Sequence, residues 1–110
     1  MKIGILLTTS PESQNSYTVV QLARAALTQG HKVSLFIMDD GVFNLKANPK
    51  NLWSAEFSTL IQAGAQITLC ASNAESRGLE KGELIDGVVF GSQYDHATIL
   101  KESDRFLVFG

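Results

Sequence analysis

Short runs of apolar residues recur along the chain, and amphipathic stretches separate them. The clearest runs are Lys2–Thr8 (KIGILLT) and Lys32–Met38 (KVSLFIM), in which apolar residues follow one another without alternation. Continuous runs of this kind are typical of strands buried on both faces of a parallel sheet. We predict further, shorter strands at Gln66–Leu69, within Leu84–Phe90 and at Asp104–Phe109.

Between these runs, apolar residues recur at the spacing of three or four that helices require. Turn-forming and capping residue types mark the starts of these segments, and glycine marks several of their ends. The predicted helices run from Asn15 or Ser16 to Gly30, from Ser54 to Gly64, over 71–79 and over 91–102.

The alternation of strands and helices predicts an α/β fold, because right-handed crossovers then build a parallel sheet. The chain has 110 residues, enough to bury one core but too few for two. We predict a single three-layer domain over 1–110, with a mostly parallel five-stranded sheet flanked by helices on both faces. The stretch from Gly41 to Asn51 is predicted as a loop, with Asn48-Pro49 as a breaker.

Composition narrows the classes of function. The net charge of -2 and the absence of a Lys/Arg cluster argue against direct nucleic-acid binding. The apolar runs are far shorter than the roughly 18 residues of a membrane span, and no leader-peptide pattern opens the chain. A single cysteine among these 110 residues agrees with a reducing compartment. We therefore expect a cytoplasmic protein.

Cys70, the single cysteine, directly follows the predicted strand Gln66–Leu69 and precedes a predicted helix. In open parallel sheets, ligands bind outside the carboxyl ends of the strands, so Cys70 lies at the edge that carries chemistry. The amides and dipole of a following helix favour the thiolate, the nucleophilic form. Arg77, about two turns further on, lies on the same helix face and can reach back toward the sulfur. A buried, purely structural thiol is the alternative.

Other polar residues fall at the same edge. The Asp39-Asp40-Gly41 turn ends the second predicted strand and is read as a solvated turn or a ligand site. Thr8, Thr9 and Ser10, together with Ser13, form a possible anion-binding loop that lacks the known nucleotide-binding motifs.

The two histidines add little to this picture. His31 belongs to the opposite edge of the sheet, which excludes it as a partner of Cys70. His96 lies about a turn into the predicted helix after Gly91, where it can approach the active edge, but a partly exposed helix residue is the favoured interpretation. One cysteine and two scattered histidines predict no metal site, and we expect no cofactor.

The sequence resembles the DsrE-like family, which includes the DsrE and TusD sulfur-relay subunits. The features that carry the resemblance span nearly the whole chain: the opening KIGILLT, the segment 30–33 (GHKV), the turn 40–44 (DGVFN), Cys70 with Asn73-Ala74 and Arg77-Gly78, and the closing 103–106 (SDRF).

The resemblance implies that Cys70 receives sulfane sulfur as a persulfide and passes it to another thiol. We expect Arg77, Asn73, Asp40 and Gly41 to be the supporting residues of this site. It further implies trimers or hexamers of small subunits, either identical or related, that exchange sulfur with donor and acceptor proteins or small thiols. The class of activity that this resemblance favours is a sulfurtransferase-type sulfur carrier.

Two alternative hypotheses about the function are also considered. One is a non-catalytic subunit or small-ligand or nucleotide-binding module in which Cys70 is structural. The other, a phosphoacceptor receiver domain, conflicts with the residues present, because Thr8-Thr9 stand where acidic residues are needed and no lysine follows the last strand.

Overall fold

The computed structural model describes residues 1–48 and 50–110, and of Leu52 the backbone only. Its strands lie in one five-stranded sheet of order β4-β3-β2-β1-β5, and every strand pair in it is parallel. The strands are β1 (Lys2–Leu7), β2 (Lys32–Ile37), β3 (Gln66–Cys70), β4 (Val89–Gly91) and β5 (Arg105–Phe109).

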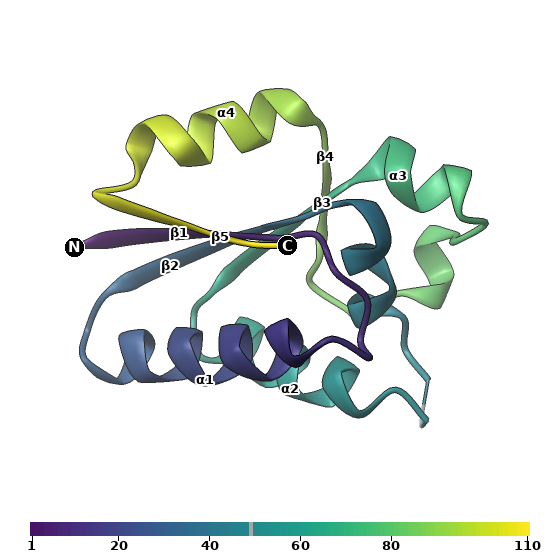
Figure 1. Cartoon of the computed structure of the whole chain (residues 1–110), viewed down its shortest axis with the longest axis horizontal. Helices are drawn as coiled ribbons and strands as arrows, with labels where there is room; N and C mark the ends of the chain where they lie inside the picture. The colour runs from purple at the N-terminus through teal and green to yellow at the C-terminus, as the bar shows by residue number, and fades with distance from the viewer. Residues whose placement is uncertain (49) are drawn as a thin grey trace.

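Helices cover both faces of this sheet, as Figure 1 shows. One face is covered by α1 (Gln14–Thr28) and α2 (Leu52–Gln62), and the other by α4 (Gln93–Glu102). The short helix α3 (Ala71–Ser76) extends from the carboxyl end of β3. The predicted α/β class, with a parallel sheet between two helical layers, is therefore confirmed.

Side-chain capping sets where α1 and α2 begin. The Ser13 hydroxyl accepts a hydrogen bond from the Asn15 N–H (3.1 Å) at the start of α1. The Asn51 side chain accepts from the Trp53 N–H (3.1 Å) in the same way. This cap explains why α2 begins two residues before the predicted Ser54, since asparagine satisfies a free N–H of the first turn.

The core is divided unequally between the two faces of the sheet. The larger cluster lies under α1 and α2 and includes the fully buried Ile5, Leu35 and Phe57. The smaller cluster lies under α4 and consists of Phe36, Cys70 and Ile99, with partly buried neighbours. Alternation along β2 separates the two clusters, because successive side chains of a strand point to opposite faces.

The predicted loop after the second strand is in fact partly helical. A 3-10 helix, η1, spans Asp39–Leu45. Its Asn44 is completely buried and donates to the carbonyls of Thr9 and Gly41, while its oxygen accepts from the Ser16 hydroxyl (2.7 Å). A search for the apolar periodicity of an α-helix misses such a segment, because it is only seven residues long and buried hydrogen bonds help to hold it beside the buried Val42 and Leu45.

Two smaller differences concern the second half of the chain. The fourth strand has only three residues, and a second 3-10 turn, η2 (Lys81–Glu83), precedes it. Of the predicted breaker Asn48-Pro49, Pro49 lies outside the described residues. Across the described ranges, the structure contains no helix whose length and apolar character would suffice for a membrane span.

Candidate active site

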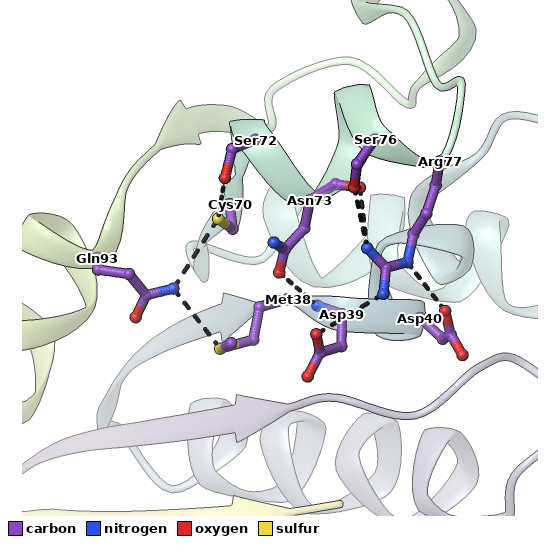
Figure 2. A network of polar contacts seen from close by, with 9 residues as sticks. All are labelled: Met38, Asp39, Asp40, Cys70, Ser72, Asn73, Ser76, Arg77 and Gln93. Carbon is purple, nitrogen blue, oxygen red and sulfur yellow. Dashed lines mark hydrogen bonds and ion pairs between the residues drawn. The ribbon is translucent and has the colours of Figure 1, made fainter.

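The carboxyl ends of β2 and β3 bring the candidate site together. Cys70 is the last residue of β3 and the N-cap of α3, while Met38 and Asp39 follow β2 next to it. Gln93 enters from the first turn of α4, which follows β4 on the other side of β3. Figure 2 shows these residues converging on the sulfur and on the adjacent turn.

Cys70 itself is a free thiol with only 3% of its surface exposed. Its Sγ lies 3.4 Å from the Ser72 Oγ and 3.8 Å from the Gln93 Nε2. Both of these neighbouring residues are exposed, so they contact the sulfur from the solvent side. The thiol therefore sits just beneath the surface, behind two polar side chains.

The environment of Cys70 favours its ionised form. Burial raises the pKa of the thiol, but several hydrogen bonds lower it. The donors are the side chains of Ser72 and Gln93 and the backbone N–H groups of Asn73 and Ser72. The lowering contributions outweigh burial, so the pKa of Cys70 lies below its ordinary value. Donors directed at a sulfur stabilise a thiolate, which is the form that reacts with other sulfur atoms.

Gln93 is a site residue that sequence reasoning missed. Its Nε2 donates to the Cys70 Sγ and also to the Met38 Sδ (3.7 Å), so a single amide bridges the two sulfur atoms. The signal available in the sequence was its place just after the fourth strand, at the sheet edge already assigned to chemistry. Without a charge or a motif, a glutamine in that place does not stand out.

Arg77 occupies a different part of the site from the one its spacing suggested. Its Nε lies 2.9 Å from the Asp40 Oδ1, and its Nη2 lies 3.7 Å from the Asp39 Oδ1. Its Nη1 donates to the Asn73 carbonyl and to the Ser76 hydroxyl. Figure 2 shows the guanidinium directed toward η1, with Asn73 between it and the sulfur. The geometry thus gives Arg77 contacts that join α3 to η1.

Asn73 and Gly41 support the same junction. The Asn73 Oδ1 accepts a hydrogen bond of 2.7 Å from the N–H of Asp39, which has a left-handed backbone (φ 51°). Aspartate tolerates this conformation better than most residues. Gly41 is buried, and a Cβ built on it would lie 2.6 Å from the Leu7 carbonyl oxygen. The close approach of η1 to the end of β1 therefore requires glycine.

The predicted anion-binding loop is occupied by internal hydrogen bonds. The Thr9 hydroxyl accepts from Asn15 (3.2 Å), the Thr8 hydroxyl donates to the Phe109 carbonyl (3.5 Å), and the Ser10 hydroxyl donates to Glu12 (3.1 Å). These bonds stabilise the loop at the end of β1. Its role in binding an anion remains a prediction.

His31 lies at the opposite sheet edge, where its Nδ1 contacts the amino group of Met1 (3.0 Å). Within the described part of the chain, no three His, Cys, Asp or Glu side chains are grouped so that they could hold a metal ion.

The fold and the site together define a small parallel α/β protein with a hydrogen-bonded thiol at the carboxyl edge of its sheet. The sequence model of the DsrE/DsrF-like family matches residues 1–109. The chain therefore belongs to the DsrE/DsrF-like family.

Similar proteins extend over the same length. The chain is 30% identical over 112 residues to an uncharacterized protein of Methanopyrus kandleri, covering 97% of this chain and 93% of that protein. An uncharacterized protein of Methanocaldococcus jannaschii is 28% identical over 114 residues, with coverages of 99% and 100%. These relatives carry no assigned activity.

Solved structures agree with the fold. The crystal structure of the YchN protein from E. coli superimposes with a TM-score of 0.85 at 25% identity and covers 99% of both chains. A protein of unknown function from Bacteroides thetaiotaomicron superimposes with a TM-score of 0.81 at 17% identity, covering 98% of this chain and 94% of that one. The second likeness concerns the fold alone.

Proposed function

We propose that this protein is a sulfur carrier that accepts sulfane sulfur on Cys70 as a persulfide and passes it to the thiol of a partner. The observation that carries the proposal is the hydrogen-bonded Cys70 thiol at the carboxyl edge of the sheet, whose donors lower its pKa. Membership in the DsrE/DsrF-like family supports it, because sulfur-relay subunits belong to that family.

The transfer consists of two displacement steps at sulfur. In the first step, the Cys70 thiolate attacks the outer sulfur of a donor persulfide, a new S–S bond forms, and the donor leaves as a thiolate. In the second step, an acceptor thiolate attacks the outer sulfur on Cys70, and Cys70 leaves as a thiolate. The sulfane sulfur moves without any net oxidation or reduction.

Hand-over must occur between molecules. The sequence contains no second cysteine that could resolve the persulfide on the same chain. The acceptor is therefore another protein or a small thiol. Because Ser72 and Gln93 cover the sulfur from the solvent side, a donor or acceptor reaches Sγ when these side chains move aside.

In this proposal Arg77, Asp40, Gly41 and the side chain of Asn73 act indirectly. Their contacts fix α3 against η1, and α3 supplies the backbone N–H groups of Ser72 and Asn73 that face the sulfur. They hold the donors in place and do not contact the transferred atom.

The test is mass spectrometry after incubation with glutathione persulfide. We expect a gain of one sulfur atom that maps to Cys70 and is lost again when excess glutathione is added. Cys70→Ser is the control and should gain nothing. A wild-type protein whose thiol reacts with iodoacetamide but that never takes up sulfur would refute the proposal.

We further propose that the chain works as a homo-oligomer, as a trimer or hexamer, or in a hetero-oligomer with related subunits. The edge strand β5 supports this, because Val108 is 64% exposed and the neighbouring Leu107 is also exposed. Apolar residues on an unpaired edge strand favour association. Sedimentation velocity on the purified chain should give a mass of three or six copies, and a monomer would restrict the proposal to hetero-oligomers.

One observation favours the alternative of a ligand-binding module with a structural cysteine. A cavity of about 440 Å³ lies between the β1 loop and the start of α2, and Pro11, Phe43, Lys46 and Trp53 contribute to its lining. Trp53 is the single tryptophan in the sequence, so its fluorescence reports on binding there. Quenching by flavin mononucleotide, together with a Cys70 that stays unreactive until the protein unfolds, would favour this alternative.

A further inference from the structure

We propose that His96 is a positioning residue for Cys70: it holds the side-chain amide of Gln93 in the orientation that directs N–H groups, and not the carbonyl oxygen, at the sulfur. The inference deepens the proposed function, since the thiolate it favours is the form that accepts sulfur. The sequence did not point to Gln93, and it favoured a partly exposed helix position for His96.

The contacts form a continuous path from His96 to the thiol. The His96 Nδ1 lies 2.9 Å from the Gln93 Oε1, and the Nε2 on the other end of the same amide lies 3.8 Å from the Cys70 Sγ. The Met38 Sδ, 3.7 Å from that nitrogen, is a second acceptor on the same side. With two sulfur acceptors at one end and a ring nitrogen at the other, the amide has one orientation that satisfies all three contacts when Nδ1 carries a proton.

The imidazole is itself fixed in place by aromatic stacking. Its ring lies parallel to that of Phe36, with centroids 4.7 Å apart and an interplanar angle of 8°, and it also stacks on Phe106 at 5.8 Å. Phe36 is completely buried in the small core cluster that also contains Cys70. A ring anchored on this cluster holds the amide more firmly than an exposed side chain could alone.

The orientation of the amide matters because its two ends have opposite effects on a thiolate. An N–H group directed at the sulfur stabilises the negative charge, whereas a carbonyl oxygen at the same place repels it. Glutamine alone can rotate between the two arrangements. A donor at Nδ1 occupies the amide oxygen and thereby favours the arrangement with nitrogen toward Cys70.

The surroundings of the ring leave this interaction undisturbed. The strand residues stacked against it, Phe36 and Phe106, are uncharged. The nearby carboxylate of Asp95 on α4 accepts a hydrogen bond from the Ser92 N–H (2.8 Å) at the helix start. Among the described side chains, the His96 ring forms its hydrogen bond with Gln93.

The pH dependence of Cys70 alkylation by iodoacetamide tests the inference. The midpoint of the rate profile measures the thiol pKa, and the plateau at high pH measures access to the sulfur. We expect His96→Phe, which keeps an aromatic ring but has no donor, to raise the midpoint. At a fixed pH below the midpoint its alkylation should be about threefold slower, as for the loss of one modest hydrogen bond to the thiolate.

Two further variants separate positioning from a general structural effect. His96→Asn retains an N–H group close to the Nδ1 position and should return the midpoint toward that of the wild type. In a Gln93→Ala background, His96→Phe should cause no further shift, because the interaction runs through the amide. His31→Phe is the matched control at the opposite sheet edge and should leave the profile unchanged.

Three results would overturn the inference: an unchanged midpoint in folded His96→Phe, a His96→Asn midpoint as high as that of His96→Phe, or a full effect of His96→Phe without Gln93. Circular dichroism of each variant verifies folding. The readout is independent of sulfur transfer. A protein with the predicted midpoint shifts that takes up no sulfur contradicts the carrier function alone, and one that takes up sulfur without such shifts contradicts the role of His96 alone.

Discussion

The guanidinium of Arg77 pairs with the carboxylate of Asp40, with Nε 2.9 Å from Oδ1, and this contact joins the end of α3 to the start of η1. Asp39 adds a second, longer contact to the same guanidinium. The two carboxylates balance the positive charge of Arg77 at some remove from the thiol. The electrostatic stabilisation of Cys70 therefore comes from neutral donors, namely a hydroxyl, an amide side chain and backbone N–H groups.

This assignment predicts that Arg77→Met affects stability more than thiol chemistry. The two carboxylates are largely exposed, with 63% of the Asp40 side chain accessible, whereas 26% of the Arg77 side chain is accessible, so the loss of the ion pairs should lower the free energy of unfolding by about 0.5–1 kcal/mol. Urea denaturation measures this difference. The Cys70 alkylation midpoint should rise less than in Ser72→Ala, because Arg77 acts on the donors only by holding α3 against η1. A rise as large as that of Ser72→Ala would show that Arg77 acts on the sulfur directly.

Ser72→Ala, in contrast, should affect the thiol chemistry of Cys70 more than the stability of the protein. The Ser72 hydroxyl is the strongest of the contacts that lower the pKa of Cys70, so its loss should raise the alkylation midpoint and slow the reaction at neutral pH. Ser76→Ala is the matched control on α3, because that hydroxyl bonds to the Asn73 carbonyl and to Arg77. Equal midpoints in the two variants would contradict the role given to Ser72.

Stability should depend on pH through Cys70. Because the pKa of the folded thiol lies below that of the unfolded chain, the unfolded state binds more protons between the two values, and stability rises with pH there. The contribution is lost as pH falls through the lowered folded pKa. The unfolding free energy of the wild type, minus that of Cys70→Ser, should therefore increase with pH across this window. A difference that is flat or falls with pH would indicate a thiol that is not stabilised as the anion.

The layout of the fold was readable from the sequence because its signals are local. Unbroken apolar runs such as Ile3–Leu7 specify buried parallel strands, and the all-parallel order then places Cys70 at the edge where ligands bind. The position of the thiol at a strand-to-helix junction follows from the same pattern. The family resemblance added the chemistry that periodicity alone does not contain.

The features that the sequence did not predict depend on contacts between residues distant in sequence. η1 depends on the buried Asn44, whose partners come from the β1 loop and from α1. Gln93 reaches Cys70 across 23 positions, through a side chain with no charge to draw notice. Arg77 was assigned to the sulfur by helical spacing, whereas α3 ends at Ser76 and the acidic turn lies within reach of the guanidinium. Spacing along one helix does not reveal competing partners on another element.

Gly41 offers a test of how closely η1 must approach the sheet. Gly41→Ala places a methyl group 2.6 Å from the Leu7 carbonyl oxygen and 3.1 Å from the Ile37 side chain. Relieving this overlap requires η1 to move away from the end of β1, at a cost of about 2 kcal/mol in the free energy of unfolding.

Gly82→Ala is the matched control, because no atom of the described residues beyond its own chain neighbours lies within 4 Å of the Cβ built on Gly82, and its backbone is not in the left-handed region. Urea denaturation should show a clear loss of stability for the first variant and almost none for the second. Displacement of η1 should also disturb the Asp39–Asn73 hydrogen bond, so Gly41→Ala should raise the Cys70 alkylation midpoint as well. A Gly41→Ala protein as stable as Gly82→Ala would contradict the close packing of η1 on β1, and with it the rigid support we assign to the donors around Cys70.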